Sequence, residues 1–259
     1  MDQLELLFLG TGTSAGIPMI GCKCEVCTSS DLKDKRNRVS VVVSYRGARV
    51  LIDAPPELRL ACVAYGVDAI DAVVFTHGHA DHIMGLDDLR RFNAIRKGPL
   101  DVWADAPTHS VLNQCFSYAF REPDPAIRLF RPHLVRRVVE GPFEVAGATW
   151  TPIRLLHGDV PVLGFRVGKM AYCTDVSRIP EESFALLEDL DVVVLDGLQW
   201  QKHSTHFTLE EAIAAGERIG AKLTLFTHIA HGLGHAVTSA KLPAGMALAY
   251  DGQRVGARL

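Results

Sequence analysis

The sequence predicts an α/β fold in which residues 1–259 form a single domain. Helical patterns alternate with short aliphatic and β-branched runs, as expected for strands buried on both faces of a sheet. Hydrophobic residues make up 48% of the chain and charged residues 22%, which supplies enough apolar surface for a large core. Layered α/β folds of this length commonly form one domain, and we find no linker, low-complexity tract or internal repeat that divides the chain.

The charge balance and the first residues exclude several classes of protein. The formal charge is 27 − 30 = −3, so no global positive field attracts polyanions, which argues against a nucleic-acid partner. No apolar run approaches the roughly 18 residues of a membrane span. The start, Met1 to Glu5, lacks the basic segment of a secretory signal. We therefore expect a cytoplasmic protein with no membrane partner.

The first hundred residues predict four strands and two helices. The strands are Leu4 to Leu9, Val39 to Ser44, Arg49 to Ile52 and Asp71 to Thr76, and the helices are Leu58 to Tyr65 and Ile83 to Lys97. The glycine-rich turn from Gly10 to Gly16 follows the first strand. Its third glycine is misplaced for a dinucleotide-binding motif, so we assign it no nucleotide.

Residues 101–140 are the hardest part of the sequence to interpret. They follow a predicted strand, Leu100 to Ala104, and contain a predicted helix, Thr108 to Phe120. A stretch broken by prolines then extends over residues 123–132. Proline-broken stretches interrupt regular structure, and we interpret this one as a variable insert near a substrate pocket.

Four predicted strands in the second half each lead to a side chain that can bind a metal. These strands cover residues 149–156, 169–173, 192–195 and 223–226, and they lead to His157, Asp175, Asp196 and His228. Between the last two strands, Thr208 and Glu211 form a capping box that opens a helix from Leu209 to Ile219. Polar side chains at several strand ends predict a functional site at one rim of the sheets.

The segment His77-Gly-His79-Ala-Asp81-His82 places four ligand-type side chains within six residues. Residues two apart in an extended segment point to the same side, so His77 and His79 can converge on one ion. Asp81 and His82, beyond the turn, are free to face a second ion. Four such side chains are costly to bury without a metal, so this segment predicts a metal site.

This motif order resembles the metallo-β-lactamase superfamily over essentially the whole chain. The resemblance implies a four-layer αββα sandwich with two metal ions at one rim of the strands. It implies that His77, His79 and His157 bind one ion and that Asp81, His82 and His228 bind the other. It implies further that Asp175 bridges the two ions. It also implies that Asp53 is a buried residue that supports the loop carrying the histidines.

Two divalent ions about 3.5 to 4 Å apart lower the pKa of a shared water and clamp an oxygen of the substrate during attack. Imidazole and carboxylate ligands favour zinc or manganese and do not discriminate between the two. Some antibiotic-hydrolysing members have a cysteine where this sequence has Asp175. The aspartate therefore favours phosphodiester or other hydrolase chemistry over β-lactam cleavage.

Three of the six cysteines, Cys22, Cys24 and Cys27, lie within six residues, a spacing that suits a metal better than disulfides. With the preceding Gly-Thr-Gly turn, the cluster resembles the phosphodiesterases of the carbon-phosphorus lyase pathway. That resemblance implies that His231, three residues after His228, completes a closed set for one structural zinc. A reactive or surface cluster is the alternative. The remaining cysteines are predicted to be small buried hydrophobes: Cys62, Cys115 and Cys173.

His206, in the segment Thr205-His206 before the capped helix, resembles the catalytic histidine of the same phosphodiesterases and a motif of ribonuclease Z. A histidine there protonates the leaving alkoxide or stabilises the charged transition state. We predict His206 and Asp81 as the catalytic residues. The alternative for His206 is an exposed loop histidine. No comparable match or role is assigned to His109, His133, His203 and His235.

Arg36 and Arg38 precede the second predicted strand. They either belong to a solvated charge run, the interpretation we favour, or face the site and bind phosphate.

The favoured function is hydrolysis of a small cyclic ribose phosphate or nucleotide phosphodiester. The first alternative is a tRNA 3′-processing endonuclease of the ribonuclease Z type, which the net charge and the lack of a basic protruding arm disfavour. The second is a non-catalytic protein of cofactor biosynthesis, like the pyrroloquinoline-quinone proteins that carry a similar cysteine cluster. Retention of all seven ligand types argues against it. The partner we expect is a small phosphodiester, and a homodimer is left open.

Overall fold

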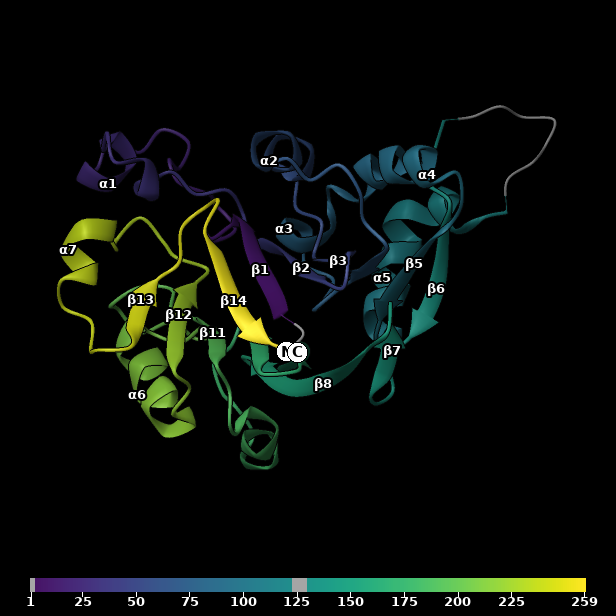
Figure 1. The fold of residues 1–259 in the computed structure, drawn as a ribbon. Coiled ribbons are helices and arrows are strands. Elements are labelled where there is room, and N and C mark those ends of the chain that lie inside the picture. Colours follow the sequence, from purple (N-terminus) through teal and green to yellow (C-terminus); the bar gives the residue numbers. More distant parts are fainter. Residues whose placement is uncertain (1–2, 123–129) are drawn as a thin grey trace.

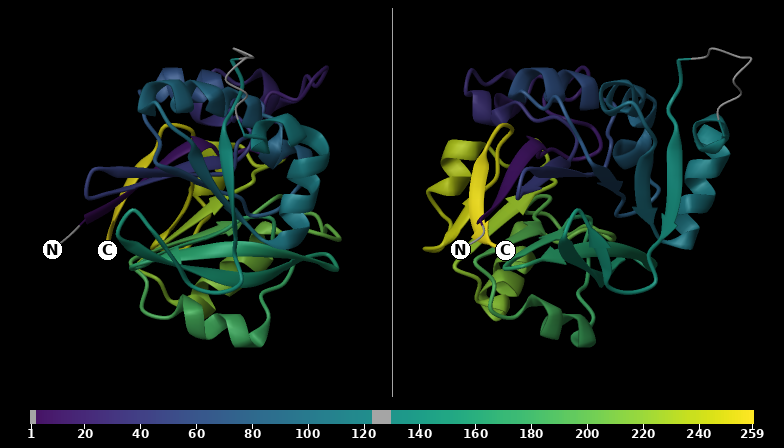
Figure 2. Two further views of the ribbon diagram at one scale, coloured as in Figure 1. Left: turned by 90° about the vertical axis from the view of Figure 1, so that its right-hand side faces the viewer. Right: turned by 45° about the vertical axis from the view of Figure 1, so that its right-hand side comes forward.

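Two seven-stranded sheets lie face to face with helices outside them in the computed structural model, which describes residues 3–122 and 130–259 (Figure 1). The views of Figure 2 show the same layering, with helices above one sheet and below the other. This arrangement is the four-layer αββα sandwich, so the predicted fold class is confirmed.

The first sheet has the strand order β14-β1-β2-β3-β4-β5-β6. Neighbours from β14 to β3 are antiparallel, whereas those from β3 to β6 are parallel. The carboxyl ends of β3 and β4 therefore meet at one edge. The strands are β1 (Gln3–Gly10), β2 (Ser40–Tyr45), β3 (Ala48–Ile52), β4 (Ala72–Val74), β5 (Leu100–Ala104), β6 (Leu134–Val138) and β14 (Arg254–Arg258).

The second sheet has the order β13-β12-β11-β10-β9-β8-β7. Strands β10 to β13 are parallel, and β8 runs in the direction of β10 because both are antiparallel to β9. The carboxyl ends of β8, β10, β11 and β12 consequently share one edge. The strands are β7 (Phe143–Val145), β8 (Ala148–His157), β9 (Val160–Val167), β10 (Met170–Cys173), β11 (Val192–Asp196), β12 (Leu223–Thr227) and β13 (Met246–Leu248).

Each sheet has its own outer layer of helices. The first is covered by α2 (Leu58–Tyr65), α4 (Arg90–Arg96) and α5 (Ala106–Phe116), and the second by α6 (Leu209–Ile219) and a 3₁₀ helix, Glu181–Leu187. The capping box at the start of α6 is present, and Gly220 ends that helix with φ 67°, as predicted. Three short helices lie in the loops: α1 (Glu25–Thr28), α3 (Ala80–Ile83) and α7 (His235–Ser239).

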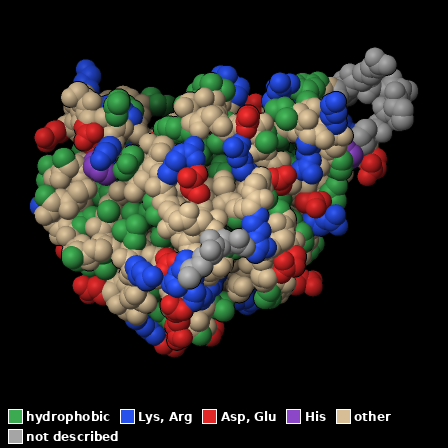
Figure 3. Space-filling model, viewed as in Figure 1, with side chains coloured by type: hydrophobic (Ala, Val, Ile, Leu, Met, Phe, Trp, Pro, Cys, Tyr) green, Lys and Arg blue, Asp and Glu red, His purple; other side chains and the backbone are tan. Residues whose placement is uncertain are grey.

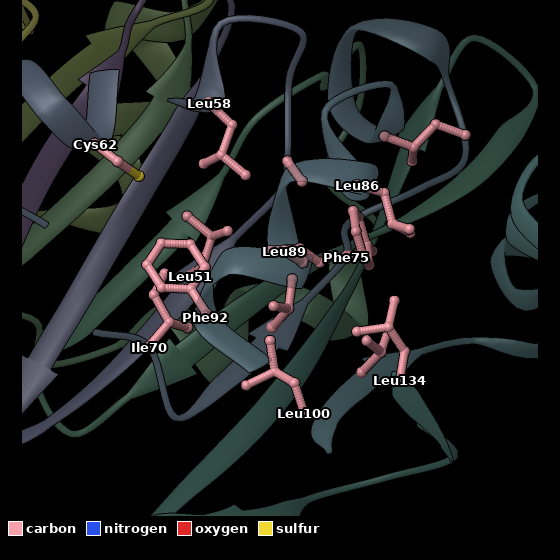
Figure 4. Packing of buried hydrophobic residues seen from close by; sticks show 14 of the residues in the cluster. Leu51, Leu58, Cys62, Ile70, Phe75, Leu86, Leu89, Phe92, Leu100 and Leu134 are labelled. Atoms are coloured by element: carbon pink, nitrogen blue, oxygen red, sulfur yellow. The ribbon is translucent and has the colours of Figure 1, made fainter. Parts of the chain in front are cut away.

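Three apolar clusters hold these layers together. Between the sheets, Phe8 and Trp150 are fully buried with side chains of both sheets around them. A second cluster joins the first sheet to its helices, where Leu58 and Phe92 pack toward Leu51 (Figure 4). The third lies between the second sheet and α6. Because both faces of both sheets are covered, central strands such as β4 and β11 read as nearly continuous apolar runs.

The prediction of one continuous helix from Ile83 to Lys97 is wrong. The chain instead forms α3, a 3₁₀ helix at Leu86–Leu89 and then α4. Gly85 separates the first two, and a Cβ at that position would lie 2.0 Å from the carbonyl oxygen of Pro55. A close approach between segments thirty residues apart decides this break, which helical periodicity does not reveal.

Smaller differences concern other predicted elements. The helix predicted from Thr108 starts at Ala106, after the capping residue Asp105, and continues after Phe116 as a 3₁₀ turn. Cys62 and Cys173 are buried as expected, but Cys115 is exposed on α5, so that prediction is wrong. Most of the predicted proline-broken insert, residues 123–129, lies outside the described residues. Of the helices that the structure describes, none combines the length and apolarity needed to cross a bilayer.

Candidate metal centre

The predicted ligands converge where the carboxyl ends of strands from both sheets meet. His77 follows β4, His157 ends β8, Asp175 follows β10 and His228 follows β12. Their ligand atoms and those of their neighbours form two groups, and within each group all of these atoms lie within 4.8 Å of one another. The groups are His77, His79 and His157, and Asp81, His82, Asp175 and His228.

Asp175 lies between the two groups. Its Oδ1 atom is 4.0 Å from His77 Nε2 and 3.3 Å from His228 Nε2, while its Oδ2 atom is 3.3 Å from His82 Nε2. Both carboxylate oxygens are thus within reach of imidazoles from different groups. This is the position that a carboxylate bridging two ions requires.

The spacing and bonding of these atoms fit divalent ions. Ligands about 2.1 Å from a tetrahedral ion are separated by roughly 3.4 Å. The Asp81 carboxylate lies 3.6 Å from His82 Nε2 and 3.7 Å from His228 Nε2, close to that value. The buried Nε2 atoms of His77, His82 and His228 have no hydrogen-bond partner in the described chain. Buried polar atoms without a partner are costly, and an ion satisfies them.

Asp53 orients the histidine loop from behind. Its Oδ2 atom is 2.8 Å from His82 Nδ1 and accepts a hydrogen bond from the Thr76 hydroxyl at 2.9 Å, while its Oδ1 atom accepts one from the Thr76 backbone N–H at 2.9 Å. With Nδ1 bound to this carboxylate, the Nε2 atom of His82 is left for the site. Asp53 is therefore placed to support the histidine loop, as the sequence suggested.

Three of these residues have backbone conformations that non-glycine residues rarely adopt. Asp53, Asp175 and His228 have φ angles of 61°, 56° and 57°, in the left-handed region. Asp53 and His228 directly follow β3 and β12, and Asp175 is the second residue after β10. Backbone strain of this kind is concentrated at functional sites, and here it coincides with three residues of the centre and its support.

The carboxylates of the centre raise the pKa values of two of its histidines, His82 and His228. Burial opposes protonation of His228, but Asp175, Asp81 and Asp196 outweigh it and raise its pKa to about 9. Burial likewise opposes protonation of His82, and Asp175 and Asp53 raise its pKa above the ordinary value. The same histidines hold the pKa of Asp175 well below its ordinary value despite burial.

Metal binding is therefore expected to release protons. At pH 7 an ion must displace protons from His82 and His228, so affinity should weaken as the pH falls from 9, by roughly tenfold per pH unit for each proton displaced. Isothermal titration calorimetry of the metal-free protein in two buffers of different ionisation enthalpy measures this release. An identical binding heat in both buffers at pH 7 would contradict the prediction.

His206 lies beside the two groups and is buried. Its ring centroid is 4.5 Å from that of His157 and 4.6 Å from that of His228. His206 Nδ1 is 2.6 Å from Asp196 Oδ2, and the same oxygen accepts the Val176 backbone N–H at 2.9 Å. With Nδ1 engaged by Asp196, Nε2 is the nitrogen available to a substrate. The alternative of an exposed loop histidine is excluded by its burial.

The cysteine cluster forms a separate group with His231. The Sγ atoms of Cys22, Cys24 and Cys27 lie 3.3, 3.4 and 3.7 Å from His231 Nδ1. Ligands of a tetrahedral zinc, with sulfur at about 2.3 Å, are separated by roughly 3.6 Å. A hydrogen bond from the Cys27 backbone N–H lowers the pKa of Cys24 to about 6, which favours its thiolate. Four ligands close the coordination shell, so the set fits a structural ion.

Substituting Cys24→Ser should destabilise the protein well before it alters turnover per folded molecule. A closed site fastens the first loop to the segment after β12 and offers no open coordination position. We expect the melting temperature to fall by at least about 10 °C. Differential scanning calorimetry with metal analysis checks this, and Cys115→Ser, which alters the exposed cysteine of α5, is the matched control. Wild-type stability and metal content in Cys24→Ser would refute a zinc site.

Comparison with known proteins identifies the family. Residues 48–229 match the model of the β-lactamase superfamily domain, which covers most of the chain and all seven candidate ligands of the rim. The chain belongs to the metallo-β-lactamase superfamily. Membership implies divalent metal ions, for which zinc is typical.

Metallo-β-lactamase-fold relatives resemble this chain to different extents. A crystal structure of a diphosphatase from the PhnP family shares 41% identity, with a TM-score of 0.92 over 99% of this chain and 98% of that one. Zinc-bound PqqB from Methylobacterium extorquens has a TM-score of 0.76 over 97% of this chain and 99% of that one, at 20% identity, which shows the fold alone. The predicted superfamily and subfamily resemblance are both confirmed.

An octanoyltransferase from Porphyromonas gingivalis is 37% identical over 231 residues, which are 88% of this chain and 46% of that protein. This metallo-β-lactamase-fold chain thus spans less than half the length of that relative.

The structure corrects our interpretation of Arg36. Its side chain is buried, and its guanidinium donates hydrogen bonds to Thr11 Oγ1 at 2.7 Å and to the Ala249 carbonyl at 2.5 Å. Arg36 thus joins distant loops inside the molecule. It is neither a solvated charge nor a phosphate contact. Arg38 forms an ion pair with Glu57 at the start of α2.

Two residues that position the centre had no assigned role in the sequence. Asp196 was recognised as a metal-competent residue, but its hydrogen bond to His206 was not expected. The Thr205 carbonyl lies 2.7 Å from His157 Nδ1 and thereby orients that ring. In the sequence, the only signals for these roles are that Asp196 follows a predicted strand and that Thr205 directly precedes His206. His109 is buried and lies 3.1 Å from the Arg137 carbonyl, away from the centre.

Proposed function

We propose that this chain is a hydrolase that uses two divalent ions to cleave small phosphodiesters. The observation that carries the proposal is the pair of ligand groups joined at Asp175, with the His206–Asp196 pair beside them. Phosphoryl transfer needs charge neutralisation, a nucleophile and help for the leaving group. The centre has residues placed for each.

In this proposal the ligands divide as the sequence suggested. His77, His79 and His157 would hold one ion, Asp81, His82 and His228 would hold the other, and Asp175 would be available to both. Zinc or manganese suits this nitrogen and oxygen set. When bound, the ion pair supplies a deprotonated water as nucleophile and offsets the negative charge of the phosphoryl group. The cysteine group holds a third ion with a structural role.

His206 assists the leaving group. Its Nδ1–H is fixed on the Asp196 carboxylate, which stabilises the positively charged ring and leaves Nε2 toward the site. A proton on Nε2 passes to the departing alkoxide, or the charged ring stabilises the transition state if no proton is needed. Asp81, between His82 and His228, contributes through the ion that it helps to hold.

Small substrates are favoured over polynucleotides. The net charge is −3, and Lys and Arg side chains are interspersed with Asp and Glu on the face shown in Figure 3, without a continuous basic track. The 41% identical relative is named a diphosphatase, which supports phosphoryl chemistry. The octanoyltransferase name belongs to a protein of which this chain spans only 46%, so that name does not by itself assign acyl transfer to this chain.

The metal-replete protein should hydrolyse 2′,3′-cyclic nucleotides or ribose cyclic phosphates faster than phosphomonoesters or β-lactams. Strained five-membered diesters present both non-bridging oxygens to a rigid pair of ions. A substrate panel with metal analysis tests this, and the kcat/KM for cyclic substrates should depend only weakly on salt. Efficient cleavage of precursor tRNA without activity on cyclic phosphates would instead favour the endonuclease alternative.

A further inference from the structure

His203 lies at the outer side of His206 and has no role in the chemistry described so far. Its ring centroid is 5.1 Å from that of His206, with the two planes tilted by 51°. His206 in turn contacts the rings of His157 and His228. His206 is buried, whereas His203 is half-buried. His203 is thus one ring farther from the candidate ions, toward solvent.

Local hydrogen bonds determine which nitrogen of His203 carries the proton. The Thr205 backbone N–H donates to Nδ1 at 3.4 Å, and the Thr205 hydroxyl lies 3.2 Å from the same atom. Because Nδ1 accepts, the neutral ring carries its proton on Nε2. Partial burial and the neighbouring His206 lower the pKa of His203, which favours that neutral ring.

The surrounding segment is tied to the metal centre. The Thr205 carbonyl is bonded to His157 Nδ1, so the residue that orients a candidate ligand also orients His203. Lys202 is engaged by Glu211, and Asp196 is engaged by His206. Beside His206, the segment therefore offers the Nε2–H of His203 as a hydrogen-bond donor.

We propose that His203 Nε2–H donates a hydrogen bond to a phosphoryl oxygen on the leaving-group side of the substrate. A hydrogen-bond donor at this position suits an acceptor-only group such as a second phosphoryl group. The candidate ions and His206 hold the scissile phosphate, and His203 lies beyond them. This inference rests on the proposed function and makes His203 a determinant of specificity for diphosphate-type substrates.

Two probes distinguish binding at the position of the scissile phosphate from binding on the leaving-group side. Calorimetry on metal-loaded protein measures binding of inorganic phosphate, which occupies the ion pair alone, and of methylenediphosphonate, which extends past it and resists hydrolysis. His203→Ala should weaken methylenediphosphonate about 10-fold to 10²-fold, as expected for a hydrogen bond to a charged group. Phosphate binding should change less than about 3-fold, since His203 does not touch it.

A conservative variant and a neighbouring variant provide the controls. His203→Gln keeps an N–H donor near the Nε2 position and should recover most of the methylenediphosphonate affinity. Ser204→Ala, at an exposed neighbouring position, should bind both probes as the wild type does. In steady-state kinetics on a diphosphate ester, His203→Ala should raise KM more than it lowers kcat.

Several results would overturn the role of His203. It would be overturned if His203→Ala bound both probes more weakly by the same factor, lost metal, or kept its wild-type affinity for methylenediphosphonate. It would also be overturned if His203→Gln did not restore that affinity. Failure of the proposed function is a different result, because a wild-type protein inactive on every phosphodiester would still bind the two probes. The binding measurements therefore test His203 independently of turnover.

Discussion

Replacing Asp175 with alanine is expected to empty or disorder the ion pair and to reduce hydrolysis by at least about 10³-fold, the effect of losing several kcal/mol of charge stabilisation. Asp175 is buried and lies 3.3 Å from both His82 Nε2 and His228 Nε2. Neither group keeps its full ligand set without this carboxylate. Metal analysis should show the loss of the rim ions, while an ion held by the cysteine cluster should be retained.

Asparagine at the same position separates charge from backbone strain. Asp175 has a φ of 56°, which strains alanine, whereas asparagine tolerates this region. Asp175→Asn should therefore retain wild-type secondary structure by circular dichroism and still lose metal and activity. Full metal occupancy with unchanged activity in either variant would refute the assignment of Asp175 as a bridging ligand.

His206→Ala is expected to lower kcat by roughly 10²-fold to 10⁴-fold at unchanged metal content, the range for loss of a positioned acid or charge stabiliser. The loss should shrink for substrates with nitrophenolate leaving groups, which need no protonation. Steady-state kinetics across a series of leaving groups measures both effects. An equal loss for all leaving groups would assign His206 to charge stabilisation, and no loss would remove it from the chemistry.

Asp196→Asn is the matched variant for the His206 pair. It keeps the shape of the buried side chain and an oxygen for the Val176 N–H, but it removes the charge that supports the His206 ring. We expect a decrease in kcat in the same direction, because the imidazole loses the carboxylate that fixes and supports it. An unchanged kcat would contradict the pairing.

Much of the ligand chemistry is encoded locally and could be predicted from the sequence. His77, His79, Asp81 and His82 follow one another at a strand end, so period-two alternation and a turn are sufficient to bring them together. The cysteine spacing and the capping box of α6 are equally local. His157, Asp175 and His228 could be predicted because parallel strands place their carboxyl ends at one edge.

Other features were decided only by the tertiary structure, because they depend on contacts between segments far apart in the chain. Arg36 is buried because Thr11 and the Ala249 carbonyl, 213 residues away, accept its hydrogen bonds. The expected helix breaks at Gly85 because the Pro55 carbonyl approaches it. Thr205 orients both His157 and His203 because its loop folds back over the rim. The sequence by itself determined which side chains are the candidate metal ligands, since their types and strand-end positions are local properties. The partners that orient them were decided by packing, since hydrogen-bond geometry between distant segments leaves no periodic signal in the chain.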